Sequence, residues 1–68
     1  MKQLVKINHE VFREAYEGLN GDRRVLCILD MNCVRYLVFV NGKLKSRREF
    51  SNGQEKTCFH NAERALNK

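Results

Sequence analysis

The sequence predicts a single α+β domain, residues 1–68, in which helices cover one face of a three-stranded antiparallel sheet. Two apolar stripes at helical spacing flank three runs typical of strands, and an Asn-Gly pair joins the last two runs. The chain of 68 residues suffices for one domain with a thin core. The expected order is α-β-β-β-α, with residues 2–7 as a further candidate strand or an extended arm.

The first helix is predicted over residues 9–19. Asn8 is a suitable N-cap, and Asn20-Gly21 is suited to ending a helix. The apolar positions recur at i, i+1, i+4, i+5 and i+8, and they are Val11, Phe12, Ala15, Tyr16 and Leu19.

The three strands are predicted over residues 23–29, 33–40 and 43–50. The first is a nearly continuous apolar run, typical of a central strand, and the second is rich in β-branched and aromatic residues. Asn41-Gly42 predicts a two-residue hairpin turn between the second and third strands, because both positions of a type I′ turn need positive φ.

The closing helix is predicted to open within residues 51–55 and to run to about residue 67. Ser51 with Gln54, and Asn52 with Glu55, both have the spacing of a capping box. The apolar stripe consists of Cys58, Phe59, Ala62, Ala65 and Leu66.

The two-residue turn also predicts a register, with Val40 opposite Lys43 and Tyr36 opposite Arg47. One face would then carry Cys33, Leu37, Phe39, Leu44, Ser46 and Phe50 and receive the helices, with Arg35 and Arg48 near its far end. The other face would carry Val34, Tyr36, Val38 and Val40 beside Lys43, Lys45, Arg47 and Glu49. We expect this second face to be open, although a covering element or a dimer contact remains an alternative.

The positive charge is concentrated in the second part of the chain. The formal charge is +5, and residues 1–22 carry more acids than bases. The densest stretch is Lys43, Lys45, Arg47 and Arg48, with no acid among them. Such a stretch indicates a site for phosphate or for an acidic protein surface, and the alternative is an edge strand whose lysines only prevent aggregation.

The residues offer little catalytic or metal-binding chemistry. Cys27, Cys33 and Cys58 fit no zinc-site spacing and occupy apolar positions, so we interpret them as small buried hydrophobes in a reducing, cytoplasmic setting. A zinc site formed by His9, His60 and two cysteines is geometrically possible but has no supporting motif. Ribonuclease chemistry at His60 is an open alternative, but we predict no enzyme, catalytic residue, metal or cofactor.

The second part of the chain resembles the DNA-binding domains of the AP2/integrase type. The resemblance covers Tyr36 to Ser46, then Phe50-Ser51, and then a helix with Ala62 and Ala65. Those domains read the DNA major groove with the exposed face of a three-stranded sheet. The resemblance implies that role here for Arg35, Tyr36, Lys43, Lys45 and Arg47.

Two further resemblances concern the element order and the size of the chain. The predicted order and residues 61–66 are similar to double-stranded-RNA-binding domains and their closing helix. The short chain and its Val-Asn-Gly-Lys hairpin are similar to small phage proteins of the anti-CRISPR and other anti-defence classes.

We therefore expect a non-enzymatic nucleic-acid-binding protein. It should contact duplex DNA, which we favour over RNA, through the basic hairpin and the exposed sheet face. The expected contact residues are Arg35, Tyr36, Lys43, Lys45, Arg47 and Arg48. The alternative is an inhibitor or adaptor of phage type that binds a host protein complex. We expect no membrane partner, because no apolar run is long enough to span a bilayer, and either a monomer or a homodimer.

Overall fold

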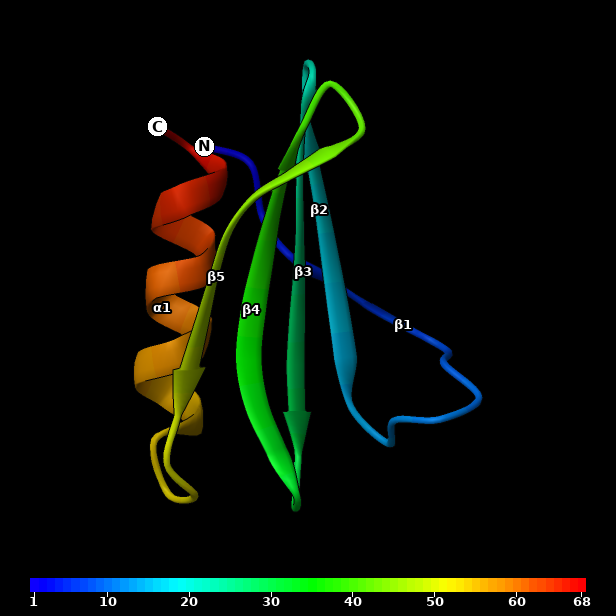
Figure 1. The fold of residues 1–68 in the computed structure, drawn as a ribbon, viewed down its shortest axis with the longest axis vertical. Helices are drawn as coiled ribbons and strands as arrows, with labels where there is room; N and C mark the ends of the chain where they lie inside the picture. Colours follow the sequence, from blue (N-terminus) through cyan, green and yellow to red (C-terminus); the bar gives the residue numbers. More distant parts are fainter.

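A computed structural model describes all 68 residues as five antiparallel strands followed by one helix (Figure 1). The strands lie in the sheet in chain order, so the topology is a simple meander. The elements are β1 (Val5–Ile7), β2 (Ala15–Asn20), β3 (Arg23–Asp30), β4 (Cys33–Val40), β5 (Lys43–Phe50) and α1 (Glu55–Leu66). The predicted α-β-β-β-α order is therefore wrong, and the order is β-β-β-β-β-α.

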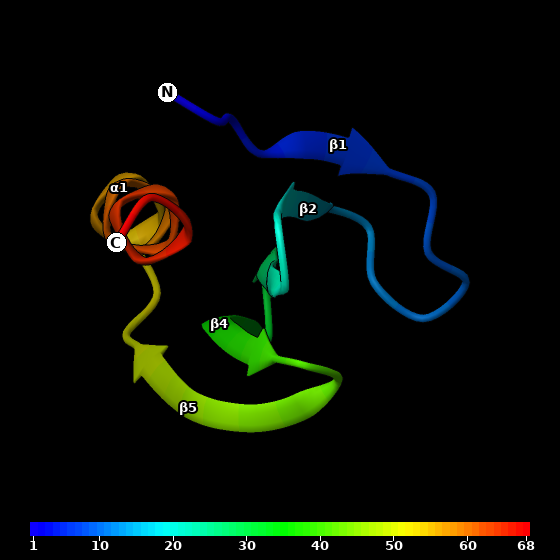
Figure 2. The same cartoon turned by 90° about the horizontal axis from the view of Figure 1, so that it is seen from above.

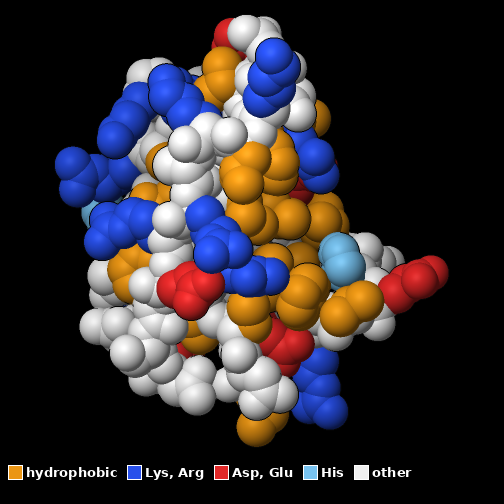
Figure 3. All heavy atoms as spheres, in the orientation of Figure 1, with side chains coloured by type: hydrophobic (Ala, Val, Ile, Leu, Met, Phe, Trp, Pro, Cys, Tyr) orange, Lys and Arg blue, Asp and Glu red, His pale blue; other side chains and the backbone are white.

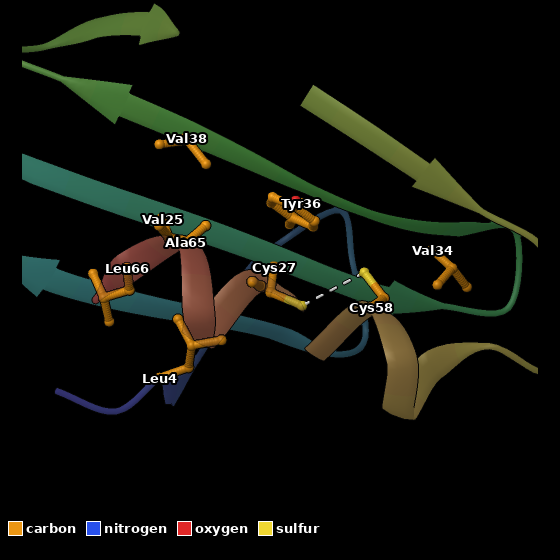
Figure 4. Close-up of a cluster of buried hydrophobic side chains, with 10 residues drawn as sticks. Leu4, Val25, Cys27, Val34, Tyr36, Val38, Cys58, Ala65 and Leu66 are labelled. Carbon is orange, nitrogen blue, oxygen red and sulfur yellow. Dashed lines mark hydrogen bonds between the residues drawn. The ribbon is translucent and has the colours of Figure 1, made fainter. Parts of the chain in front are cut away.

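The helix lies against one face of the twisted sheet, while the loop of residues 8–14 lies on the other side (Figure 2). The core is enclosed between the helix and that face (Figure 4). Its members come from β3, β4 and α1, together with one residue that precedes β1, and they are Leu4, Val25, Cys27, Val34, Tyr36, Val38, Cys58, Ala62, Ala65 and Leu66.

The predicted helix over residues 9–19 does not form. Residues 8–14 are an irregular loop, tied to β3 by bonds from the Arg13 and Leu29 amides, and β2 begins at Ala15. Glycine weakens the interior of a helix or of a strand by about 0.5–1 kcal/mol, so the packing at Gly18 decides between the two. In β2 its missing Cβ leaves room for the Leu66 and Leu4 side chains. The packing of β2 against the helix therefore decides the structure of residues 15–20, although their apolar residues have the spacing of a helix.

The glycine turns explain why the predicted helix end at Asn20-Gly21 is also wrong. Asn41 and Gly42 have φ values of 54° and 79°, which confirms the predicted hairpin turn. Gly21 also has a positive φ, 63°, but it sits in the turn between β2 and β3. The Asn20-Gly21 pair is thus part of a hairpin and not the end of a helix.

A β-bulge in β5 changes the predicted hairpin register. Val40 pairs with Lys43 and Phe39 with Leu44, as predicted, but Val38 then pairs with Ser46. Lys45 is the extra residue, so every later pair moves by one position and Tyr36 lies opposite Arg48.

The predicted assignment of the two sheet faces is also wrong. The helix covers the β4 face that carries Val34, Tyr36 and Val38, all of which are buried. The face with Cys33, Leu37 and Phe39 is the one that no helix covers. The sequence pattern of β4 is apolar on both sides, so alternation alone could not choose between the faces.

The helix begins at Glu55, later than the capping boxes predict. The Gln54 side chain still accepts a bond from the Ser51 amide at 3.1 Å, which is one arm of the expected box. At the other end, Asn20 and Arg23 donate to the carbonyls of Leu66 and Ala65. Side chains of the sheet therefore satisfy helix carbonyls that would otherwise lack partners.

Candidate nucleic-acid interface

The basic stretch forms an edge of the sheet. β5 pairs only with β4, and every residue from Lys43 to Glu49 is exposed. No backbone hydrogen bond outside the β4–β5 ladder involves β5. The four cations of the stretch therefore stand at the surface, which fits both the predicted electrostatic site and its alternative, a protective edge strand.

The bulge at Lys45 divides these cations between two sides of the sheet. Lys43 and Arg48 lie opposite Val40 and Tyr36, which places them on the side of the helix. Arg47 lies opposite Leu37 on the open side.

On the helix side, Arg48 contributes to a basic groove between β5 and the end of α1. Arg64 and Lys68 come from the helix and the end of the chain just beyond it, and Asn61 adds an amide. Tyr36 and Ala65 complete the lining, and none of these six residues has an acidic side chain. One cation from β5 and two from the end of α1 and the residues after it thus converge without an acidic side chain among them. Figure 3 shows Lys and Arg gathered along β5 and the helix side of the molecule.

Local contacts leave the charges of this groove free. Arg23, not Arg64 or Lys68, caps the helix carbonyls. The only ion pairs in the structure are Arg24–Glu17 at 2.6 Å and Arg47–Glu49 at 3.7 Å. Arg48 stacks its guanidinium over the Phe50 ring at 5.2 Å, which orients the group without reducing its charge. The groove is therefore suited to an anion such as a phosphate.

Two further predicted contact residues, Tyr36 and Arg35, do not stand together on an open face. Tyr36 is only 7% exposed and packs under the helix, so its predicted place at the centre of an open face is wrong. Arg35 lies on the open side, and its buried Nε has no hydrogen-bond partner. The structure brings Arg48 together with Arg64 and Lys68, while Arg35 and Arg47 face the opposite direction.

Sequence reasoning missed Arg64 and Lys68 as candidate contacts. His60, Arg64 and Lys68 recur at i, i+4 and i+8, the spacing of one helix side. That signal is present in the sequence, but only the packing of the helix beside β5 gives it meaning.

The cysteines do not add a reactive centre. Cys27 and Cys58 are buried, and their Sγ atoms lie 4.0 Å apart (Figure 4). Burial raises the pKa of the Cys27 thiol far above its ordinary value, and the neighbouring Cys58 raises it further. Burial likewise raises the pKa of Cys58. No group of three or more His, Cys, Asp and Glu residues is placed to hold a metal ion.

Comparison of the chain with protein-family models, curated proteins and solved structures finds no match. No helix of the structure has the length and apolar character needed to cross a membrane.

Proposed function

We propose that this protein binds duplex nucleic acid, with DNA favoured over RNA, through the basic surface formed by β5 and the end of α1. The observation that carries the proposal is the groove in which Arg48, Arg64 and Lys68 converge without an acidic side chain. Lys43 and Lys45 extend this positive surface toward the 41–42 turn. We call these five residues the basic surface. Binding of this kind needs no catalytic group, and a reducing cytoplasmic setting agrees with three free cysteines.

The chemistry of the basic surface favours contact with the phosphate backbone. Cations on phosphates supply affinity and position a protein on the duplex, but they carry no sequence information. The aromatic rings next to the groove belong to Tyr36 and Phe50, which stack on each other with centroids 6.1 Å apart. Proteins that hold single strands stack bases on free aromatic faces, and this surface presents none in the open. We therefore expect duplex binding with weak sequence preference.

A salt titration tests this function. With about four phosphate contacts, raising the salt from about 50 to about 200 mM weakens binding on the order of 100-fold. Fluorescence anisotropy of a labelled duplex measures the affinity at each salt concentration. No binding of micromolar protein at the lowest salt would rule out the proposed function.

Charge reversal locates the surface. Arg48→Glu with Arg64→Glu removes two contacts, so the slope of log affinity against log salt falls by about 1.8. The matched control is Lys6→Glu with Arg13→Glu, which changes the net charge equally at exposed positions in β1 and the 8–14 loop. A control pair that weakens binding as much as the test pair would show that net charge, and not the groove, determines affinity.

A second candidate function is binding to another protein, as a phage-type inhibitor would do. The observation that favours it is the open face of the sheet, where Leu19 and Leu44 are 62% and 55% exposed. Capture of a defined host complex by a protein that fails to bind duplexes would support this candidate over the first.

A further inference from the structure

The face of the sheet opposite the helix exposes a run of apolar side chains. Leu19 and Leu44 are mostly exposed, and Leu26, Leu37 and Phe39 between them are partly exposed. Figure 3 shows the resulting hydrophobic area beside β5. A contiguous apolar area on a small protein is typical of an interaction surface.

The strand register arranges this open face in rows that cross the sheet. One row runs from β2 to β5 through Glu17, Leu26, Leu37 and Arg47. The next row, toward the 41–42 turn, runs through Leu19, Arg24, Phe39 and Leu44. Each row has matching groups at its ends: an acid and a base in the first, and two leucines in the second.

We propose that the open face binds a second copy of this chain, with Glu17 of each copy against Arg47 of the other. The surface carries its own complement, which is what a two-fold symmetric interface requires. The symmetry axis would run parallel to the strands, between β3 and β4.

A half-turn about that axis exchanges β2 with β5 and β3 with β4. In the first row, Glu17 then faces the partner's Arg47, and Leu26 faces the partner's Leu37. In the second row, Leu19 faces the partner's Leu44, and Arg24 faces the partner's Phe39. Within one chain, the Arg24 guanidinium already lies over the Phe39 ring, 5.5 Å from its centroid. The same kind of cation–π contact can therefore form between Arg24 and the partner's Phe39.

The third row limits the interface to one end of the face. It runs through Ala15, Ile28, Arg35 and Glu49, and Ala15 and Ile28 are already buried. The loop of residues 8–14 lies on this side of the sheet (Figure 2). Contact between copies is therefore confined to the two rows nearer the 41–42 turn, where the exposed leucines lie.

Charge favours a second copy over a foreign partner. Glu17 already pairs with Arg24 of its own chain at 2.6 Å, but a second copy brings a further cation to Glu17 and an acid to Arg47 at once, which a partner of a single sign does not. Arg47 has one contact of its own, to Glu49 at 3.7 Å with both side chains mostly exposed, so it remains available. The basic surface on the helix side stays free in this dimer, because Lys43 and Arg48 lie on the opposite side of the sheet.

Two single charge reversals test the proposal. Glu17→Arg places two positive charges together at both ends of the interface, and Arg47→Glu places two negative charges together. Sedimentation velocity at high micromolar concentration should show a dimer for the unmodified protein. Each variant alone should self-associate at least about tenfold more weakly, because two pairs are reversed in every dimer.

An equimolar mixture of the Glu17→Arg and Arg47→Glu variants provides the decisive measurement. In the mixed dimer, the arginine introduced at position 17 of one chain meets the glutamate introduced at position 47 of the other. The unmodified pair occupies the second end, so the mixture should recover the dimer. Circular dichroism of each variant alone confirms that it is folded, and recovery on mixing excludes misfolding in any case.

Three results would overturn the proposal: a monomeric unmodified protein at high concentration, single variants that still form dimers, or a mixture that stays monomeric. None of them bears on duplex binding, which depends on the basic surface. A monomeric protein that binds duplexes would refute the dimer alone, and a dimer without salt-sensitive binding would refute the proposed function alone.

Discussion

Gly18 is the tightest point between the sheet and the helix, and Gly18→Ala should destabilise the protein. A Cβ at this position would overlap the Leu66 Cδ2 atom and lie 2.9 Å from the Leu4 Cδ2 atom. Leu66 is fully buried, and Leu4 is 7% exposed, so neither side chain can move without repacking.

The size of the effect follows from two opposing contributions. Overpacking of a core costs about 1–3 kcal/mol. Gly18 has no positive φ, so alanine suits its backbone and lowers the entropy of the unfolded chain, a gain of about 0.4–1 kcal/mol. The net loss in the free energy of unfolding should be about 1–2 kcal/mol.

Urea unfolding of a double-mutant cycle measures this contact. Leu66→Val removes the overlapping Cδ2 atom and is mild enough for a domain with little stability to lose. In that background only the 2.9 Å contact with Leu4 remains, so Gly18→Ala should cost clearly less, and the two substitutions should couple by about 1 kcal/mol. Ser46→Ala, at an exposed strand position, serves as the control and should stay within about 0.5 kcal/mol.

Additive effects in the cycle would refute this reasoning. A Gly18→Ala cost that persists at full size beside Leu66→Val would mean that the loss comes from the Leu4 contact or from the backbone of β2. The close approach of helix and sheet would then not be the reason for glycine at this position.

Three further outcomes follow from the buried side chains. Under native conditions, Ellman's reagent should modify Cys33 well before Cys27 and Cys58, because those two are buried and their thiol pKa values are raised; equal rates would contradict this order. A raised thiol pKa in the folded state means that the unfolded chain loses its proton first, so stability should fall as the pH rises above the ordinary thiol value of 9.0. Chemical unfolding across this range should show a shallower fall for Cys27→Ala, and an unchanged slope would count against the pKa shift. Tyr36→Phe should leave duplex affinity within about twofold by anisotropy, since Tyr36 lines the groove with only 7% of its surface exposed; a loss near tenfold would make its hydroxyl a contact group.

The last three strands and the closing helix were predictable because their signals are local. The bounds 33–40 and 43–50 agree with β4 and β5, and the Asn41-Gly42 turn has the expected φ values. β2 was not predictable in the same way. Ala15, Tyr16 and Leu19 fit a helical stripe, and only the packing of Gly18 against Leu66 favours the strand.

The candidate site was predictable in its charge but not in its geometry. The four cations of β5 are exposed as expected, but a single bulged residue, Lys45, decides which side each one faces. No residue type in this stretch signals a bulge, since lysine has no special backbone preference. The contribution of Arg64 and Lys68 depends on how the helix returns beside the sheet, which is a long-range property.

The alternation of side chains along β5 has an evolutionary consequence. Arg47 and Arg48 are neighbours in the chain, yet they project to opposite sides of the sheet, toward two surfaces that share no side chain. A substitution at one position can therefore be selected without altering the other surface. Deletion of Lys45 would remove the bulge but keep this arrangement, because Leu44 would then be followed by Ser46 and the pairs Leu37–Arg47 and Tyr36–Arg48 would form a regular ladder.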